Sequence, residues 1–291
     1  MTFEKKITYL LFIIITPFFT INDGQAQDAD WHEELKYLLY SPRYFGPNAF
    51  PLPELRSGRL GTRREAELRG EYHEYKGDRT KDVYARLFVP VAEGRAGLEI
   101  CGVIYEYYNM TEKTVEERHA AGRYWDAGAY GDVIISSFYQ LLRDDKRADI
   151  MLEASLKTAS GNRLADARYT DAATYWFNLN AGRYLYKNHT HSSYLRIHGL
   201  AGFYCWMTND IIHRQNDAVL YSAGISGTHK NFTVNADIAG FYGYKNNGDR
   251  PLQLRVKLNY EYRNNIISFR YKHGMKDCLY NCFSSAYIRC F

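Results

Sequence analysis

The chain has 291 residues, a formal net charge of +4 and 46% hydrophobic residues, enough for one large or two ordinary domains. Its small charge, and the lack of a basic run with interleaved aromatic residues, exclude a nucleic-acid-binding surface. The 27 Tyr and 15 Phe against 7 Pro are typical of β-strands, whose pleated surface accepts aromatic side chains. We therefore expect a largely β-structured chain without a nucleic-acid partner.

The first 26 residues, Met1–Ala26, have the organisation of a secretory signal peptide. Lys5 and Lys6 are positive, 7–21 is apolar, and Gly24–Ala26 supplies small residues at the cleavage position. A transmembrane anchor is the alternative, but polar residues and a proline interrupt a run that is short for a bilayer of about 30 Å. No comparable apolar run follows, so a membrane-spanning chain would have to be a closed β-barrel.

Residues 27–62 form a polar, proline-rich segment. Prolines at 42, 47, 51 and 53 exclude a helix interior and a central strand. The segment also carries more aromatic residues than a loose linker would: Tyr40, Tyr44, Phe45 and Phe50. We expect it to be a periplasmic segment or plug that packs on the mouth or lumen of a barrel, or that docks a periplasmic partner through residues 40–55. The alternative is an ordered surface loop without a function.

Strand-like segments follow one another from residue 63 to residue 291. In Leu252–Tyr262, apolar and polar residues alternate without exception, which predicts a β-strand with one apolar and one polar face. The segment 178–192 is either a long turn or an extra hairpin, so the count of about 12 strands has 10 and 14 as alternatives. The other expected strands are 63–76, 82–91, 98–108, 131–142, 148–158, 169–177, 194–207, 217–226, 231–244, 266–272 and 282–291.

The connections between these strands alternate in length, and none holds a helix long enough to cover a parallel sheet. Short turns alternating with longer loops are typical of an antiparallel outer-membrane barrel. We therefore predict an all-β fold, an antiparallel up-and-down transmembrane β-barrel over residues 63–291. The short turns are 92–95, 143–147, 227–230 and 263–265, and the longer loops are 109–130, 159–168, 208–216, 245–250 and 273–281.

A secreted soluble β-sandwich or a lipocalin-like barrel is the rival architecture. It would place the apolar strand faces in a core. Small residues on those faces fill a large core poorly but are acceptable against lipid, which favours the membrane barrel. The small residues assigned to the apolar faces are Ala148, Ala154, Gly199, Ala201, Ala218 and Gly224.

The C-terminus carries a further signal. The chain ends in Phe291, with Tyr287 four residues earlier in a strand-like segment. This ending resembles the C-terminal assembly signal of Gram-negative outer-membrane β-barrel proteins. The resemblance implies an outer-membrane location, a surrounding lipid phase and recognition of the last strand by the barrel-assembly machinery. Arg289 departs from the apolar pattern, and we expect it to reach the lipid headgroups.

In a membrane barrel the polar strand faces line the lumen. The expected lumen is mixed in sign, with basic residues gathered near the C-terminus, which favours anionic or sugar-like solutes. A lumen closed by ion pairs between neighbouring strands is the alternative. Expected lumen-lining residues are Arg86, Asp149, Glu153, Lys157, Arg196, His198, Asp237, Gln253, Arg255, Lys257, Asn259, Glu261, Arg270 and Lys272.

Two loop clusters are expected at the outer rim of the barrel. They contain Asn, Gly, Asp and Pro, which are also ordinary turn formers, so a ligand-contacting or gating surface and a plain turn are both open. The rim residues are His213, Arg214, Asp217, Asp249 and Arg250.

The sequence contains no recognisable catalytic or metal-binding motif. There is no G-x-S-x-G, and no serine stands beside a histidine with an orienting acid. The H-T-H at 189–191 lacks a third ligand nearby, so we predict no metal and no cofactor. The five cysteines leave at least one free thiol; Cys278 and Cys282 are candidates for a disulfide, and Cys205 is expected to face lipid.

These patterns predict a function as well as a fold. We expect a porin-like channel or small-solute transporter with a polar, partly basic lumen, and no enzymatic activity. A non-conducting structural or assembly barrel is the first alternative. A lipid-acting barrel enzyme that uses His198 with Ser193, Ser222, Ser268 or Ser284 is the second.

Overall fold

The computed structural model describes residues 35–122, 126–190 and 192–291. The predicted signal peptide, residues 27–34 and His191 of the H-T-H motif lie outside these ranges. Within them, no helix combines the length and the apolar character needed to cross a bilayer.

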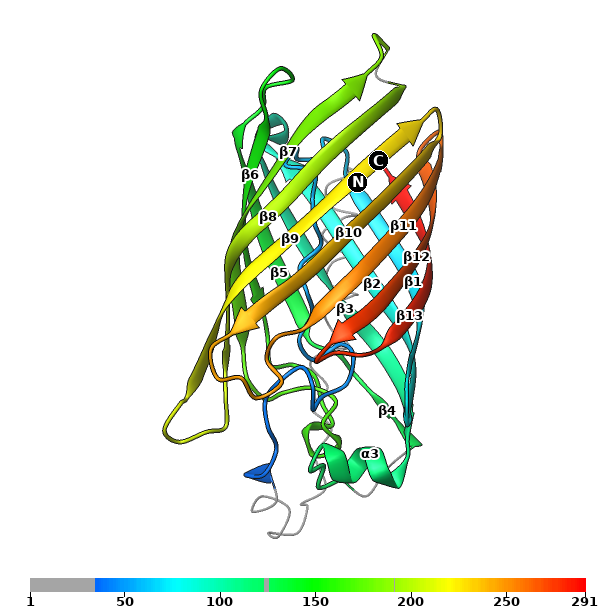
Figure 1. Ribbon diagram of the computed structural model, residues 1–291. Coiled ribbons are helices and arrows are strands. Elements are labelled where there is room, and N and C mark those ends of the chain that lie inside the picture. Colours follow the sequence, from blue (N-terminus) through cyan, green and yellow to red (C-terminus); the bar gives the residue numbers. More distant parts are fainter. Residues whose placement is uncertain (1–34, 123–125, 191) are drawn as a thin grey trace, which may run out of the picture.

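Twelve strand positions close into one antiparallel barrel in the described part of the chain. Figure 1 shows the tilted strands, and the ring closes where β1 pairs with β13. The short β4 and β5 both pair with β3 and so share one position in the wall. The strands are β1 Glu65–Tyr75, β2 Asp78–Val91, β3 Ala96–Met110, β4 Asp126–Ala129, β5 Val133–Leu142, β6 Asp149–Lys157, β7 Thr174–Lys187, β8 Ser193–Met207, β9 Gln215–His229, β10 Phe232–Gly243, β11 Leu252–Tyr262, β12 Asn265–Lys276 and β13 Asn281–Cys290.

This architecture confirms the predicted antiparallel barrel and its strand count. The undecided segment 178–192 forms no extra hairpin, because β7 continues through it to Lys187. The pairing of β7 with β8 shifts register between Tyr184 and Tyr186, so the strand absorbs an irregularity instead of turning back.

The two ends of the barrel differ in their connections. The short-turn end carries the connections after β2, β5, β7, β9 and β11, and the other end, the long-loop end, carries those after β3, β6, β8, β10 and β12. The loop predicted at 273–281 is shorter than expected and spans 277–280, because β12 continues to Lys276. The helix α3, Glu112–Glu117, lies at the long-loop end. The tight Lys76–Gly77 turn after β1 is an exception there: Gly77 has φ +91°, and a Cβ on it would lie 2.2 Å from Thr114 Oγ1.

Apolar side chains cover the outside of the barrel. In β11, the outward side chains of Leu258 and Tyr262 are 40% and 53% exposed. The side chain of Arg255, on the opposite face of the same strand, is 12% exposed. The same distribution holds in β6, where Leu152 faces out and Glu153 is buried. An apolar exterior around a polar interior is the arrangement of a barrel surrounded by hydrocarbon, and it contradicts the soluble alternative.

The face assignment of β9 was wrong for two of the small residues. Ala218 is buried inside with the aromatic cluster of the long-loop end, and a Cβ on Gly224 would lie 2.9 Å from Leu55 Cδ2 inside the barrel. The outward residues of β9 are Val219, Tyr221 and Ile225. Both faces of this strand contain small or apolar residues, so alternation alone did not distinguish them.

Candidate functional site: the barrel interior

The described part of the N-terminal segment, residues 35–62, lies inside the barrel; we call it the interior segment. Figure 1 shows it in blue, running within the barrel away from the long-loop end. It begins at that end, where Arg43 N donates to Gly248 O and Gly46 N donates to Ala167 O. It reaches the opposite end at Leu60, whose N–H donates to Gln140 Oε1.

The first part of the interior segment packs into an aromatic cluster at the long-loop end. Phe45 is fully buried, and Phe50 meets Trp206 with ring centroids 5.6 Å apart. Trp206 Nε1 donates to Tyr40 O over 2.8 Å. Burial and a hydrogen bond to Asp171 raise the pKa of Tyr40 well above its usual range. The expected aromatic packing therefore lies in the lumen, away from the mouth formed by the short turns.

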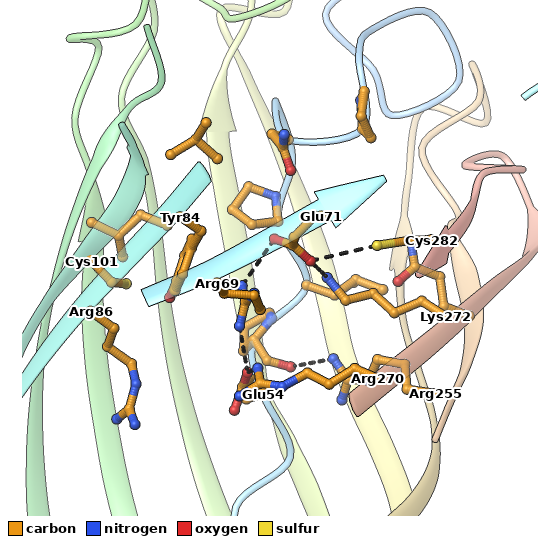
Figure 2. A pocket seen from close by; sticks show the side chains of 18 of the residues that line it. Glu54, Arg69, Glu71, Tyr84, Arg86, Cys101, Arg255, Arg270, Lys272 and Cys282 are labelled. Carbon is orange, nitrogen blue, oxygen red and sulfur yellow. Dashed lines mark hydrogen bonds and ion pairs between the residues drawn. The ribbon is translucent and has the colours of Figure 1, made fainter. Parts of the chain in front are cut away.

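The middle of the interior segment meets the wall through charge. Glu54 Oε1 lies 2.8 Å from Arg270 Nη1, and Glu54 Oε2 lies 3.8 Å from Lys257 Nζ. Arg255 Nη1 donates to Pro53 O over 2.9 Å, and Arg56 Nη2 pairs with Glu99. Figure 2 shows Glu54 joined to Arg69 of β1 and Arg270 of β12.

The last part of the interior segment has its backbone groups satisfied by wall side chains. Arg196 donates from Nε and Nη2 to Ser57 O, at 3.1 and 2.8 Å. Asn180 Oδ1 accepts from Arg56 N. Because a chain enclosed in a barrel cannot reach bulk water along its length, these side chains replace the missing strand partners.

A salt bridge fixes the segment at the short-turn end. Arg59 pairs with Asp149 at 3.1 Å and also with Asp145 of the turn after β5. Hydrogen bonds from Lys187 and Arg59 lower the pKa of Asp145 to about 2. The contact therefore stays ionic throughout the neutral and mildly acidic range.

The wall charges also pair with one another. Arg86 contacts Glu67 at 2.9 Å and Glu99 at 2.9 Å, and Arg69 contacts Glu71 at 3.1 Å. Buried charges need such partners because desolvation is costly. The network therefore belongs to the wall itself, and the interior segment adds to it.

A second charged cluster joins the long loops to the end of the barrel. Arg168 is fully buried and contacts Asp78 at 2.6 Å and Glu106 at 2.8 Å. Arg118, which follows α3, reaches the same Asp78 at 2.8 Å. Together with Tyr280 these groups join the loops after β3, β6 and β12 to the wall.

Little space remains between the segment and the wall. The cavity measures about 180 Å³ and is lined by both, including Glu54, Arg56, Glu71 and Lys257. This is below the roughly 300–1,000 Å³ typical of small-molecule sites. In this conformation the described residues leave room for water and small ions.

The residues predicted for the lumen lie on inward-facing strand positions. A buried pair joins Lys157 to Asp132, and a partly buried pair joins Asp237 to Arg255. Glu261 lies at the short-turn mouth, where it contacts Arg63 at 2.8 Å. Most of the predicted residues contact the interior segment or contact a wall residue that does. These residues are Arg86, Asp149, Glu153, Arg196, Arg255, Lys257, Arg270 and Lys272. Gln253 lines the same cavity, whereas Asn259 and His198 each keep a buried polar atom that has no hydrogen-bond partner in the described residues.

The predicted rim residues differ from one another in exposure. His213 and Arg214 are exposed, and Asp217 and Arg250 are half-buried. Asp249 is fully buried: its Oδ2 accepts from Asn216 Nδ2 at 2.9 Å and from Lys245 N at 3.0 Å. Asp249 thus organises its loop and is not part of the rim surface.

The C-terminal residues and the cysteines can also be placed. Tyr287 and Phe291 are on the outer face, 50% and 65% exposed, and Phe291 N donates to Arg64 O at the barrel seam. All five cysteines are free, so the candidate pair Cys278 and Cys282 forms no disulfide in the structure.

Sequence reasoning missed several interior groups. Glu71, His73 and Asp82 alternate inward on β1 and β2 and are buried. Their alternation was visible, but neighbouring charges on the outward positions weakened the pattern. Glu54 and Arg56 carried no signal, because an irregular segment has no periodicity from which to infer a facing direction.

Comparisons with known proteins agree on the fold. No family model matches the sequence, and no curated protein matches it significantly. The chain is similar in structure to the COG4313 outer membrane channel from Pseudomonas putida F1, with a TM-score of 0.55 and 11% identity over 83% of this chain and 100% of that chain. It also resembles the KdgM porin, with a TM-score of 0.47 and 10% identity over 77% and 99% of the two chains.

A third similar structure is the transport unit of the autotransporter AIDA-I from Escherichia coli, with a TM-score of 0.48 and 9% identity over 87% of this chain and 100% of that chain. At such identities, likeness establishes fold alone, and the scores below 0.5 add no argument. The likeness to the first of these structures, the apolar exterior and the closed antiparallel ring lead to one conclusion. The protein is a closed antiparallel twelve-stranded β-barrel of the outer-membrane type, and it shares this fold with the outer membrane channel from Pseudomonas putida F1.

Proposed function

We propose that this protein is an outer-membrane channel for small anionic solutes and that the interior segment is its plug. The observation that carries the proposal is the position of Glu54. Its carboxylate lies among Arg270, Lys257 and Arg69, and its side chain is 48% exposed inside the barrel, on the cavity lining. A tethered carboxylate thus occupies a basic site that a free carboxylate or phosphate would also fit.

The wall supports an open state because many of its charges do not depend on the plug. Arg86 keeps Glu67 and Glu99, and Arg270 keeps Glu67 at 2.8 Å. Lys257 differs: within the described residues, Glu54 is the carboxylate in ion-pair range of its Nζ. Withdrawal of the plug would therefore leave a stable wall in which Lys257 of β11 has no carboxylate partner among the described residues, while Arg255 keeps Asp237.

The outer-membrane location rests on the exterior and the C-terminus. The apolar band suits hydrocarbon, and Tyr287 with Phe291 occupies the outward face of the last strand. A chain that leaves the cytoplasm by a cleaved signal peptide would reach this membrane through the periplasm and be assembled there by the barrel-assembly machinery.

Planar-bilayer recording of the refolded protein tests the proposal. We expect low conductance from the full chain, and stepwise anion-preferring conductance after deletion of residues 35–55. In the deletion background, Lys257→Gln should reduce the anion preference. Retention of heat-modifiable electrophoretic mobility shows that each variant is folded. A folded deletion variant that does not conduct would overturn the proposal.

A non-conducting structural barrel is the second candidate, favoured by the aromatic cluster that closes the long-loop end. Docking of a periplasmic partner through residues 40–55 would require Phe45 and Phe50 to leave that cluster, where both are buried. Loss of a co-purifying periplasmic protein upon deletion of residues 40–55, with no change in conductance, would favour this candidate.

A lipid-acting enzyme is disfavoured by the direction of His198. It lies on the inward face of β8, two residues from Arg196, which reaches the interior segment. Its Nδ1 is buried and lacks a hydrogen-bond partner in the described part of the chain. Such a histidine has no access to lipid outside the barrel, so His198→Ala should leave lipid turnover unchanged.

A further inference from the structure

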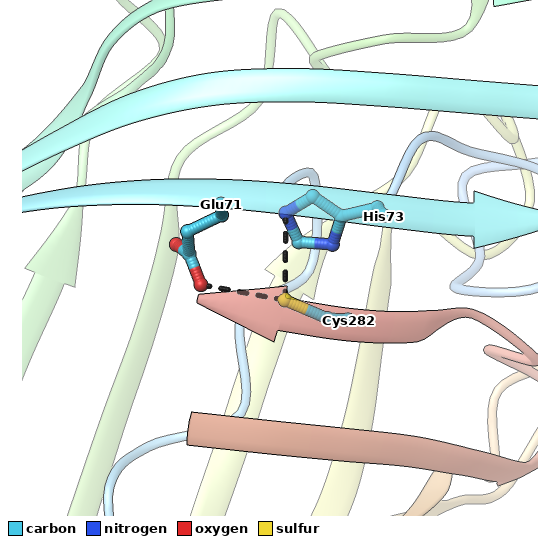
Figure 3. A group of neighbouring side chains, drawn as sticks. All are labelled: Glu71, His73 and Cys282. Atoms are coloured by element: carbon cyan, nitrogen blue, oxygen red, sulfur yellow. Dashed lines mark hydrogen bonds between the residues drawn. The ribbon is translucent and has the colours of Figure 1, made fainter. Parts of the chain in front are cut away.

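Three adjacent strands bring a set of metal-ligating side chains to one spot on the inner wall. Glu71 and His73 share the inward face of β1, because they are two residues apart. Cys282 of β13 is the register partner of His73, and Asp82 of β2 is the register partner of Glu71. The cluster thus spans the seam where the first and last strands of the barrel meet, as Figure 3 shows for Glu71, His73 and Cys282.

The cysteine sulfur lies close to the other two donors of the group. Cys282 Sγ lies 3.5 Å from Glu71 Oε1 and 3.9 Å from His73 Nε2. With zinc–sulfur bonds near 2.3 Å and zinc–nitrogen or zinc–oxygen bonds near 2.0 Å, neighbouring donors are about 3.3–3.5 Å apart. The two contacts of the sulfur therefore lie within a few tenths of an ångström of these values, and all three donor atoms lie within 4.8 Å of one another.

A fourth donor lies next to them. Asp82 Oδ2 is 2.9 Å from His73 Nε2. Asp82 is not among the donor atoms that lie within 4.8 Å of one another, so its carboxylate moves towards the ion to take the fourth position when the ion replaces the proton on this nitrogen. Its other oxygen, Oδ1, is buried and has no hydrogen-bond partner among the described residues. A buried carboxylate oxygen without a partner is costly, and a cation would satisfy it.

Neighbouring side chains hold these donors in place. Lys272 Nζ lies 3.2 Å from Glu71 Oε1, and Arg69 Nη2 lies 3.1 Å from Glu71 Oε2. Asn48 of the interior segment donates to Asp82 Oδ2 at 2.9 Å. Such outer contacts orient metal ligands, and the two cations more than offset the single negative charge that three anionic donors leave around a divalent ion.

We propose that Glu71, His73, Cys282 and Asp82 form a binding site for Zn²⁺ inside the barrel. One thiolate, one imidazole and two carboxylates suit a borderline divalent ion and not Ca²⁺ or Mg²⁺, which take oxygen ligands. Glu71, His73 and Cys282 line the interior cavity, which gives an ion a place of access. Binding releases the Cys282 thiol proton to solvent, and the proton on His73 Nε2 is released as well or moves to Nδ1.

Zinc content of the folded, detergent-solubilised full chain tests the site. After chelator treatment, incubation with Zn²⁺ and desalting, we expect one bound zinc per barrel. Replacement by Co²⁺ should give a thiolate-to-cobalt charge-transfer band and the intense visible bands of a tetrahedral site. Cys282→Ser should abolish the charge-transfer band and weaken zinc binding by more than about tenfold.

Cys205→Ser is the matched control, because Cys205 is also a buried free cysteine but lies on β8. It should keep both the zinc and the cobalt band. His73→Gln should weaken zinc binding like Cys282→Ser, and heat-modifiable mobility checks that each variant is folded. Equal zinc content in wild type and a folded Cys282→Ser variant, or a cobalt spectrum without the thiolate band, would overturn the proposal.

Discussion

At the residue scale, the interior is governed by charges that have almost no access to water. Arg168 shows the principle: its guanidinium satisfies Asp78, Glu106 and Thr80 at once. Removal of one member of a buried ion pair leaves the other charge uncompensated, which costs about 3–5 kcal/mol. Such residues therefore determine whether the loops stay on the barrel.

Arg168→Met should lower the free energy of unfolding by about 3–5 kcal/mol, because Asp78 and Glu106 lose their partner inside the barrel. Urea titration of the detergent-solubilised protein, followed by tryptophan fluorescence, measures this. Arg147→Met is the control, since its side chain is 87% exposed in a turn. Equal midpoints for both variants would show that the buried cluster does not stabilise the fold.

Glu54→Gln should loosen the plug. The amide keeps the size of the side chain but loses the charge that faces Arg270 and Lys257. Bilayer recording should then show more frequent openings than in wild type, on the order of ten times more for the loss of one strong charged contact. Glu93→Gln, in the exposed turn after β2, is the control. Identical opening frequencies would argue against charge as the holding force.

At the element scale, the interior segment fits because the wall has no side chain at the point where the two backbones meet. A Cβ on Gly182 of β7 would lie 2.1 Å from Ser57 O. Glycine at this position lets the backbone of the segment approach the strand, which no side chain would permit. Both the shape and the charges of the wall therefore match the interior segment.

Gly182→Val should push the interior segment off the wall while the barrel persists. Limited proteolysis should then cut within residues 35–62 faster than in wild type, and heat-modifiable mobility should be retained. Gly70→Val is the control, because a Cβ on Gly70 meets no atom within 4 Å. Unchanged cleavage of the Gly182→Val protein would mean that the segment tolerates the added side chain by a local shift.

At the scale of the whole molecule, the alternation of side chains was sufficient to predict the barrel, and contacts distant in sequence were not predictable. Leu252–Tyr262 has a strict period of two, and its faces follow directly from that period. By contrast, Arg270 meets Glu54 across 216 positions and Cys282 meets Glu71 across 211. Those encounters depend on ring closure and on the path of an irregular segment, which no local spacing encodes.

Phe291→Ala should impair assembly of the barrel in the outer membrane, because the aromatic ring faces outward at the end of β13. Its backbone bond from Phe291 N to Arg64 O survives the change, so the folded barrel should keep its stability once formed. Membrane fractionation compares this variant with Phe283→Ala, an outward phenylalanine on the same strand. Equal membrane yields would show that the terminal ring is not read during assembly.

The path of the interior segment has a consequence for the order in which the molecule is made. The segment leads directly into β1, whose free edge is taken by β13, the described strand furthest from it along the chain. Once that ladder has formed, the ring offers no sideways entrance. The segment must then be enclosed at the moment of closure or be threaded end-on afterwards. Unless the segment is threaded afterwards, the final pairing step also decides whether the finished barrel contains its own N-terminal chain.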